Sequence, residues 1–420
     1  MSVNPAYRTH LILSFLIDGA HVLIWTGFTI YQLTVVNMSP LQLVLVGSVL
    51  EITILLCEVP TGVIADLISR RLSIMLGFTL TGGAYLLQAL VPTFPIAVLG
   101  AVIWGVGITC VSGAYDAWLA DELGQEHLGS ALLRGEQVAR VAALCGLAGS
   151  AILGSIALGL PVLVGGCLFI IGAAYCLIAM PETHFRRAVD DERTTWHRMA
   201  TTLRDGVRLV RRRPYLLRLL AVLFFFGLFS EAWDRLWQSH LVLTFDLAAL
   251  TPIAPIVLLA ALIGIEMLLS IAAAEVLRRR LRSDDQRQTQ RLVFGFTAVM
   301  VAGLLIYGLA PHIGIAVIAF LGFSVARGLI GPLLSTWQNA QIDDSRVRAT
   351  VLSLGGQSDA LGQLAGGLPL GAIGNRSLRA AFVTSAILLV PNLWLLRGRP
   401  TLAAVPVLEA AELVDGSTTN

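Results

Sequence analysis

Lysine is absent from this sequence of 420 residues, so all 29 basic residues are arginine. A Walker A loop needs a lysine on the nucleotide phosphates, and a Schiff base to retinal or pyridoxal phosphate needs a lysine amine. The absence of lysine excludes both kinds of site. The five cysteines lie inside apolar runs without C-x-x-C spacing, which argues against a disulfide framework or a zinc site.

Charged residues are also scarce. They form 13% of the chain, against about 25% in a typical globular domain, while 56% of the residues are apolar and the mean hydropathy is +0.78. Apolar runs of about 20 residues recur along the chain, and each is long enough to cross a hydrocarbon core about 30 Å thick. The net charge of +2, with arginines spread among loops, does not favour nucleic acid as a partner. The chain is therefore expected to lie in a lipid bilayer.

The hydropathy pattern predicts an all-α membrane protein with twelve transmembrane helices. Turn-forming residues separate the apolar runs, as at 37–40, 92–95 and 311–314. The approximate limits of the predicted helices are 10–36, 41–65, 72–91, 95–120, 131–158, 161–180, 215–245, 252–277, 290–310, 313–341, 349–374 and 378–397.

The arginines predict the orientation in the membrane. If the first helix leaves the cytoplasm, 24 of the 29 arginines fall on the cytoplasmic side. This asymmetry follows the positive-inside rule. The first apolar segment is too long for a signal peptide and is followed by no small-residue cleavage site, so it is expected to stay as a helix. We expect a multi-pass protein of the inner (cytoplasmic) membrane with both termini in the cytoplasm.

One long polar stretch divides the chain into domains. The pattern predicts an N-terminal six-helix bundle over 1–181, a cytoplasmic linker over 182–214, a C-terminal six-helix bundle over 215–400 and a cytoplasmic tail over 401–420. In the linker, apolar residues such as Trp196, Met199 and Leu203 recur at helical spacing, with Arg204 and Arg208 on the other face. This indicates a basic amphipathic helix on the membrane surface, and the alternative is a flexible, partly helical linker.

The two halves of the sequence repeat one another. Trp118 is followed by acidic residues and corresponds to Trp337, which is also followed by acidic residues. Trp25 in the first helix corresponds to Trp237 in the seventh. Small-residue ladders also recur in the fifth and eleventh helices, around Gly146 and Gly362, where they favour close helix packing. A duplicated bundle is typical of transporters that work by alternating access.

The loop between the second and third helices reads Gly62-Val-Ile-Ala-Asp66-Leu-Ile-Ser-Arg70-Arg71. This pattern, G-x-x-x-D-x-x-x-R-R, resembles the signature loop of the major facilitator superfamily. The resemblance covers the whole chain in helix number, central linker and repeat, and implies two pseudo-symmetric six-helix bundles. Residues 58–62 and 115–122 look like the bacterial drug-efflux-like branch of that superfamily.

The resemblance also implies a conformational latch on the cytoplasmic side. Asp66 would cap the N-terminus of the eleventh helix, and Arg70 would pair with acids at the end of the fourth, which holds the halves together in the outward-open state. The alternative is that Asp66 and Arg70 only set the turn and the topology. Asp116 and Arg140 are further expected to pair with each other. The latch candidates are Gly62, Asp66, Arg70, Arg71, Asp116, Asp121 and Arg140.

Charges inside the predicted helices of the first half are candidates for proton coupling, because each costs about 2.5–3.5 kcal/mol at the bilayer centre. Glu51 lies near the middle of the second helix, and Asp18 and His21 share a face of the first. Proton coupling needs groups that change charge at accessible pH, which burial can produce in a carboxyl group and which histidine offers unaided. Glu51 is the first candidate, followed by Asp18 with His21, and a satisfied interior histidine is the alternative for His21.

The seventh helix carries a second charged group, Glu231, Asp234 and Arg235. Glu231 and Arg235 at i,i+4 can neutralise one another and leave Asp234 on another face. Arg327 in the tenth helix is a candidate to hold an anionic group or to neutralise an acid. A self-satisfied ion pair that fixes helix packing is the alternative to a substrate site. The predicted substrate cavity comprises Trp25, Glu231, Trp233, Asp234, Arg235, Trp237 and Arg327.

These features predict a secondary active transporter. We expect a monomer that exports amphipathic small molecules in exchange for protons by rocking of its two halves, driven by the proton motive force without a cofactor or metal. A proton symporter or facilitator that imports a specific metabolite is the alternative. An enzyme would have to use the acid pairs at 190–191, 284–285 and 343–344, which have no recognisable catalytic spacing. A non-transporting sensor would have no need of Glu51 and Asp18 inside the membrane.

Overall fold

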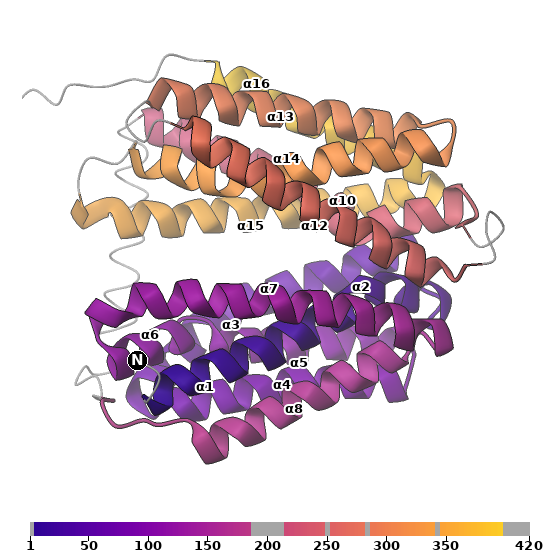
Figure 1. The fold of residues 1–420 in the computed structure, drawn as a ribbon. Coiled ribbons are helices and arrows are strands. Elements are labelled where there is room, and N and C mark those ends of the chain that lie inside the picture. The colour runs from indigo at the N-terminus through magenta and orange to yellow at the C-terminus, as the bar shows by residue number, and fades with distance from the viewer. Residues whose placement is uncertain (1–3, 186–213, 248–252, 282–285, 341–344, 398–420) are drawn as a thin grey trace, which may run out of the picture.

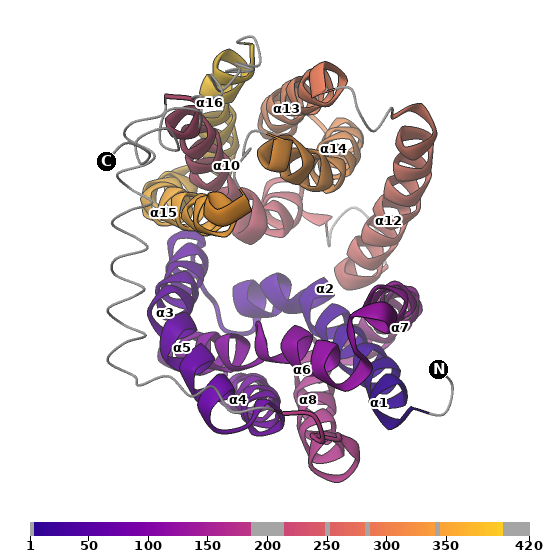
Figure 2. The same ribbon diagram turned by 90° about the vertical axis from the view of Figure 1, so that its left-hand side faces the viewer.

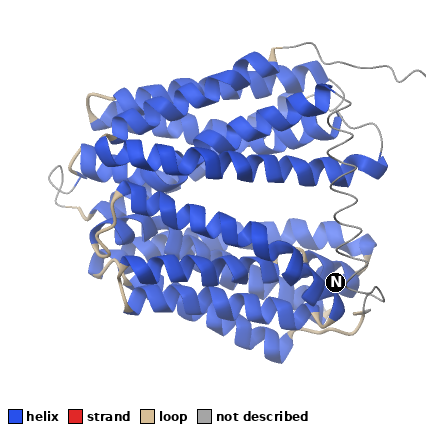
Figure 3. Ribbon diagram, turned by 180° about the vertical axis from the view of Figure 1, so that it is seen from behind, coloured by secondary structure: helices blue, strands red, loops and turns tan. Residues whose placement is uncertain are grey.

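The computed structural model describes residues 4–185, 214–247, 253–281, 286–340 and 345–397. All regular structure in these ranges is helical, and no strand occurs in them (Figure 3). The predicted amphipathic helix of the linker, the C-terminal tail and the acid pairs at 190–191, 284–285 and 343–344 lie outside the described residues.

Six helical segments form before the linker. The first consists of α1 (Pro5–Leu13), the π-helical turn η1 (Ser14–Asp18) and α2 (Gly19–Thr34), and the fourth of α5 (Phe94–Val111) and α6 (Ala114–Leu123). The others are α3 (Pro40–Leu67), α4 (Arg70–Leu90), α7 (Gln125–Ile156) and α8 (Leu160–Ala179). Their starts follow cap chemistry, since Ser39 and Gln42 form a capping box on α3 and the Ser69 hydroxyl accepts from Leu72 N at 3.0 Å at the start of α4.

Six more segments follow the linker. The seventh consists of α10 (Pro214–Ser239) and the π-helical turn η2 (His240–Thr244). The others are α12 (Pro255–Arg280), α13 (Gln286–Leu309), α14 (Ile313–Ala340), α15 (Ser345–Arg376) and α16 (Leu378–Leu396). The twelve helical segments within the described residues confirm the twelve predicted from the sequence.

Eleven of the twelve are long and apolar enough to span a membrane, and α15 is the exception. At 32 residues it is amply long, but glycine, serine and glutamine lower its hydropathy. These small and polar residues match its position, because α15 packs against both α10 of its own half and α3 of the other.

Helices α1–α8 lie on one side of the molecule and α10–α16 on the other (Figure 2). The N-terminal end of α1, the C-terminal ends of α8 and α16 and the start of α10 all lie at one end of the bundle, which we call the linker end. We call the opposite end the far end. The ribbons of the two halves approach at the far end and diverge toward the linker end (Figure 1).

Side-chain contacts between the halves agree with this arrangement. Asn375 Oδ1 accepts a hydrogen bond from Leu41 N at 2.9 Å, and Gly371 packs on Val44, both near the far end. Ile256, at the far-end start of α12, contacts Gly27 of α2 and Gly154 of α7. The structure therefore represents a state in which the far end is closed.

Candidate substrate and proton site

Two ion pairs on α10 are the basis of the candidate site. Arg235 Nε lies 3.4 Å from Glu231 Oε2, and the side chains are 13% and 3% exposed. Asp234 points to a different neighbour, Arg327 of α14, whose two terminal nitrogens donate to its two carboxylate oxygens at 2.6 and 2.8 Å. The predicted i,i+4 pair of Glu231 and Arg235 is thus formed. Arg327 neutralises an acid, which is one of the two roles predicted for it.

The Arg235 guanidinium also reaches the other half of the molecule. It lies 5.6 Å from the ring centroid of Trp25 on α2, within the range of a cation–π contact. Gly47 of α3 leaves room for the same guanidinium, because a Cβ atom at that position would meet Arg235 Nε. Trp25 in turn stacks on His21, with ring centroids 5.7 Å apart. Arg235 is therefore held at the interface between the halves.

Two further acids face this cluster without an arginine of their own. Glu51 of α3 interacts electrostatically with Arg235, Asp234 and Asp359, and no hydrogen bond or ion pair to its carboxylate is formed within the described residues. Asp359 of α15 accepts a hydrogen bond from Gln363 Nε2 at 2.8 Å and interacts with Arg327 and Asp234. Glu51 belongs to the first half and Asp359 to the second.

The cluster as a whole has more acids than bases. It contains four carboxylates and two guanidiniums, a formal charge of −2, contributed by Glu51, Glu231, Asp234, Arg235, Arg327 and Asp359. The Asp234 and Arg327 side chains remain 45% and 31% exposed, although their helices lie among the other helices of the bundle. The arrangement can accept protons or a cation, and the accessible Asp234–Arg327 pair can exchange partners with a polar ligand.

Asp18 and His21 lie apart from these acids. Asp18 ends the π-helical turn η1 and is exposed, and its electrostatic neighbour is Glu136 of α7. A π-helical turn changes the direction of the residues around it and is frequent at functional sites. The structure thus contains a second, purely acidic pair in the first half, formed by Asp18 and Glu136.

The two tryptophans of α10 serve packing. Trp233 is 5% exposed and lies among Phe320, Phe323 and Tyr307, with its ring centroid 3.8 Å from that of Phe323. Trp237 packs on Phe320 with ring centroids 4.6 Å apart. We assign both to the aromatic core of the second half, since their rings pack on aromatic side chains of α13 and α14.

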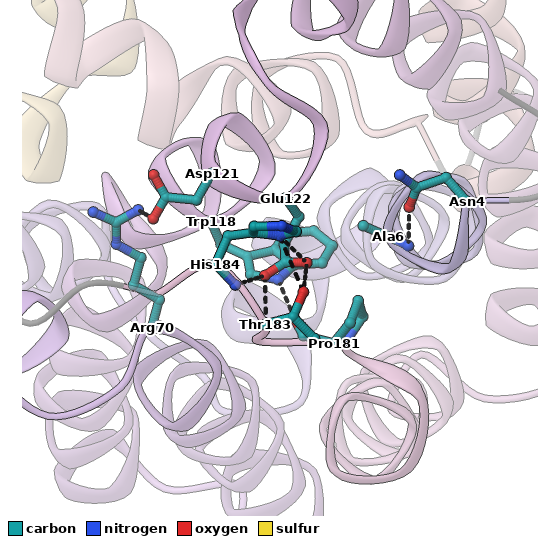
Figure 4. A network of polar contacts seen from close by, with 9 residues as sticks. All are labelled: Asn4, Ala6, Arg70, Trp118, Asp121, Glu122, Pro181, Thr183 and His184. Atoms are coloured by element: carbon teal, nitrogen blue, oxygen red, sulfur yellow. Dashed lines mark hydrogen bonds and ion pairs between the residues drawn. The ribbon is translucent and has the colours of Figure 1, made fainter.

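The latch residues lie at the linker end. Arg70 forms an ion pair with Asp121 of α6 (Figure 4). Its guanidinium also lies 3.7 Å from the carboxylate of Asp66. Asp66 is 59% exposed, and a Cβ atom at Gly62 would meet open space. The expected pairing of Arg70 with an acid at the end of the fourth segment is formed. The expected partner of Asp66, the start of α15, follows residues 341–344, which lie outside the described part.

Two more acids fasten the start of the linker to the same region. Glu122 accepts hydrogen bonds from the backbone nitrogens of Thr183 and His184 at 2.7 and 2.9 Å (Figure 4). Glu182 accepts from Ser69 Oγ at 2.7 Å and from Arg71 N at 3.0 Å, and Arg71 also donates to the carbonyl of Leu177. The first residues after α8 are therefore tied to the loop that carries the latch.

The expected pair of Asp116 and Arg140 is not formed within the described residues, where both side chains are exposed. The reason is a break in the fourth segment. Gly113 adopts a φ of +71°, so α6 restarts at Ala114 and places Asp116 in its first turn. There Asp116 interacts electrostatically with His10, whose Nδ1 lies 2.9 Å from Tyr115 Oη.

Asp359 and Glu136 are not among the residues predicted for the site. Both are carboxylates within predicted membrane helices, which is the signal that could have included them in the site. Their partners could not be derived, because the rotation of each helix about its axis is a property of the packed bundle.

Comparison with known proteins identifies the family of the chain. A model of the Major Facilitator Superfamily matches residues 11–367. The uncharacterized MFS-type transporter YxaM of Bacillus subtilis (strain 168) is 23% identical over 359 residues, which cover 85% of each chain.

Solved structures share the fold at low sequence identity. A mutant of the nucleoside transporter NupG aligns with a TM-score of 0.75 at 13% identity, covering 93% of this chain and 98% of that one. A bacterial homologue of the human lysosomal transporter Spinster, in an inward-facing and unoccupied conformation, aligns with a TM-score of 0.70 at 13% identity, covering 93% and 95%. At these identities the likeness shows the fold alone.

Proposed function

Because the chain belongs to the Major Facilitator Superfamily, and is a membrane transporter of that type and not an enzyme, we propose that it is a proton-coupled exporter of cationic amphipathic molecules. The observation that carries the proposal is the charged cluster between the halves, with its formal charge of −2. A buried excess of carboxylates is costly unless protons or a cation compensate it.

The two acids without an arginine supply the coupling. Glu51 and Asp359 come from opposite halves and interact with each other and with Asp234. A carboxylate can bind a proton or an organic cation but not both at once. Competition of this kind exchanges one for the other, and an inward proton gradient then drives the cation outward.

The surroundings suit an amphipathic cation. Trp25 presents an aromatic face next to Arg235, and Trp104 lies 5.5 Å behind it, centroid to centroid. A cation that binds Glu51 can lay its apolar part on these rings. The resemblance of residues 58–62 and 115–122 to the drug-efflux-like branch supports the same direction of transport.

The contacts between the two halves indicate how the halves rock during transport. With the far end closed, the cluster is reached from the linker end, which the arginine distribution assigns to the cytoplasm of a cell with the protein in its inner membrane. In the opposite state the linker end closes, and Asp66 with Gly62 meets the start of α15 to hold it shut.

A second candidate function is favoured by one contact. The Asp234–Arg327 pair is bidentate yet accessible, so an anionic group of a substrate can replace Asp234 on the guanidinium. Such a site suits the import of a zwitterionic or anionic metabolite together with a proton.

Reconstituted protein tests the proposal. Proteoliposomes with an imposed pH gradient, a panel of fluorescent cationic and zwitterionic compounds and an internal pH dye report both fluxes. We expect cations to accumulate against proton flow in the wild type. Glu51→Gln removes one of the two unpaired acids and is expected to abolish pH-driven flux, while the protein remains folded and inserted.

A matched control is Glu266→Gln. Glu266 lies within the membrane helix α12 and accepts a hydrogen bond from Ser270 at 2.7 Å, outside the cluster, so its variant is expected to transport normally. Uptake of zwitterions with protons would favour the second candidate. Unchanged pH-driven flux in Glu51→Gln would remove Glu51 from proton coupling.

A further inference from the structure

A groove separate from the charged cluster opens at the linker end between α12 and α14. It has a volume of about 440 Å³ and is lined mainly by apolar side chains, with Thr289 of α13 at its base. One wall contains Leu277 of α12 and Leu281, which directly follows that helix, and the other contains Leu329, Pro332 and Leu333 of α14. In Figure 2, α12 stands apart from the α13–α14 pair on this side.

Helix α12, which forms one wall of the groove, is little covered by the other helices. Helix α12 has the least buried membrane-length window of the eleven, with 22% of its residues buried. Several of its apolar side chains are exposed, among them Leu268, Ile271 and Val276. An apolar groove of this kind in contact with a bilayer is expected to be filled by an acyl chain.

Positive charge gathers at the mouth of the groove. Arg278 is one of its lining residues, and Glu275 pairs with both Arg278 and Arg279 at 2.8 and 2.6 Å, which leaves one of the two charges uncompensated. Arg280, Arg287 and Arg291 are exposed and have no acidic partner within the described residues. Over 275–291 the sequence has six arginines against three acids.

We propose that this groove is a binding site for an anionic phospholipid of the adjacent leaflet. One acyl chain lies between α12 and α14, and the phosphodiester group meets the arginines at the end of α12. Basic pockets between membrane helices on the cytoplasmic side are suited to anionic head groups. The site is independent of the transported substrate, and it would fill the space that separates α12 from α14 in the state closed at the far end.

The test compares two lipids that differ only in head group. The purified full-length protein, depleted of lipid in detergent, is titrated with phosphatidylglycerol or phosphatidylcholine of identical acyl chains, and native mass spectrometry records the bound lipid. We expect saturable, tighter binding of phosphatidylglycerol. Each arginine near an anionic group contributes about fivefold, so Arg278→Gln with Arg280→Gln is expected to weaken phosphatidylglycerol binding by roughly 30-fold.

Two further variants separate the groove from general surface charge. Ala274→Trp fills the groove from an exposed position and is expected to reduce the binding of both lipids. Arg134→Gln removes an exposed arginine at the same end of α7, in the other half, and is expected to leave lipid binding unchanged.

Three results would overturn the proposal. They are equal binding of the two lipids, an equal loss in Arg134→Gln, and full phosphatidylglycerol binding in Ala274→Trp. The last would mean that the head group adsorbs to the arginines without an acyl chain in the groove. All variants are compared at matched melting temperature and gel-filtration profile, so that misfolded protein does not count as loss of binding.

Discussion

At the residue scale, the charge balance of the site depends on which acid each arginine pairs with. Arg235 pairs with Glu231 within one helix, whereas Arg327 reaches Asp234 from a different helix. Both arginines are needed to offset the electrostatic repulsion among the four carboxylates of the cluster. Glu51 and Asp359, which have no arginine of their own, are then the groups free to respond to protons or substrate.

The Asp234–Arg327 pair provides a prediction of stability. Arg327→Gln leaves Asp234 without its bidentate partner, and we expect a loss of roughly 1–3 kcal/mol in the free energy of unfolding, measured in detergent by chemical denaturation. Adding Asp234→Asn removes the unpaired charge and is expected to recover more than half of that loss. If the double variant is no more stable than Arg327→Gln, the two residues do not stabilise each other.

At the element scale, glycines set how closely helices approach. Gly362 and Gly366 of α15 face the backbone of α10 at Phe224 and Leu228, and Gly227 of α10 faces the carbonyl of Asp359. In the first half, Gly146 of α7 meets the backbone of α2 at Gly19 in the same way. The small-residue ladders of the repeat are thus contacts between helix backbones, as the sequence predicted.

These contacts predict a position-dependent response to alanine. A Cβ atom at Gly362 would overlap the Phe224 carbonyl, so Gly362→Ala is expected to destabilise the protein by roughly 1–3 kcal/mol. Gly356 on the same helix has open space around its Cβ position, and Gly356→Ala is expected to be neutral or stabilising because alanine favours helix. Equal melting temperatures for the two variants would contradict the close approach of α10 and α15.

The sequence predicted the helices better than it predicted the contacts between helices. Helix number and limits follow from runs of apolar residues between turns, which are local signals. The Glu231–Arg235 pair was also predictable, since both residues lie on one helix. The Asp234–Arg327 pair, the approach of Glu51 to Asp359 and the place of Trp233 in an aromatic core depend on helix rotation. The break at Gly113, which separates Asp116 from Arg140, depends on one backbone angle that no periodicity reveals.

At the scale of the whole molecule, the state with the far end closed is one of two that transport requires. The contacts of Leu41 with Asn375 and of Ile256 with Gly27 must break when the far end opens. Contacts at the linker end, around Asp66 and Gly62, must then form. In the proposed mechanism, protonation or cation binding at the cluster lowers the electrostatic cost of bringing Glu51 and Asp359 together and so shifts the balance between the two states.

The most direct test of this coupling measures both ends of the same two helices. In a variant without the five native cysteines, spin labels at Leu133 and Val276 report the linker end of α7 and α12. Labels at Ile156, the last residue of α7, and at Ile253, two residues before α12, report the far end. Double electron–electron resonance in lipid nanodiscs then gives the two distances as a function of pH. We predict that lowering the pH moves them in opposite directions and that Glu51→Gln removes the response. Distances that change together, or a pH response that survives in Glu51→Gln, would contradict alternating access controlled by the charged cluster.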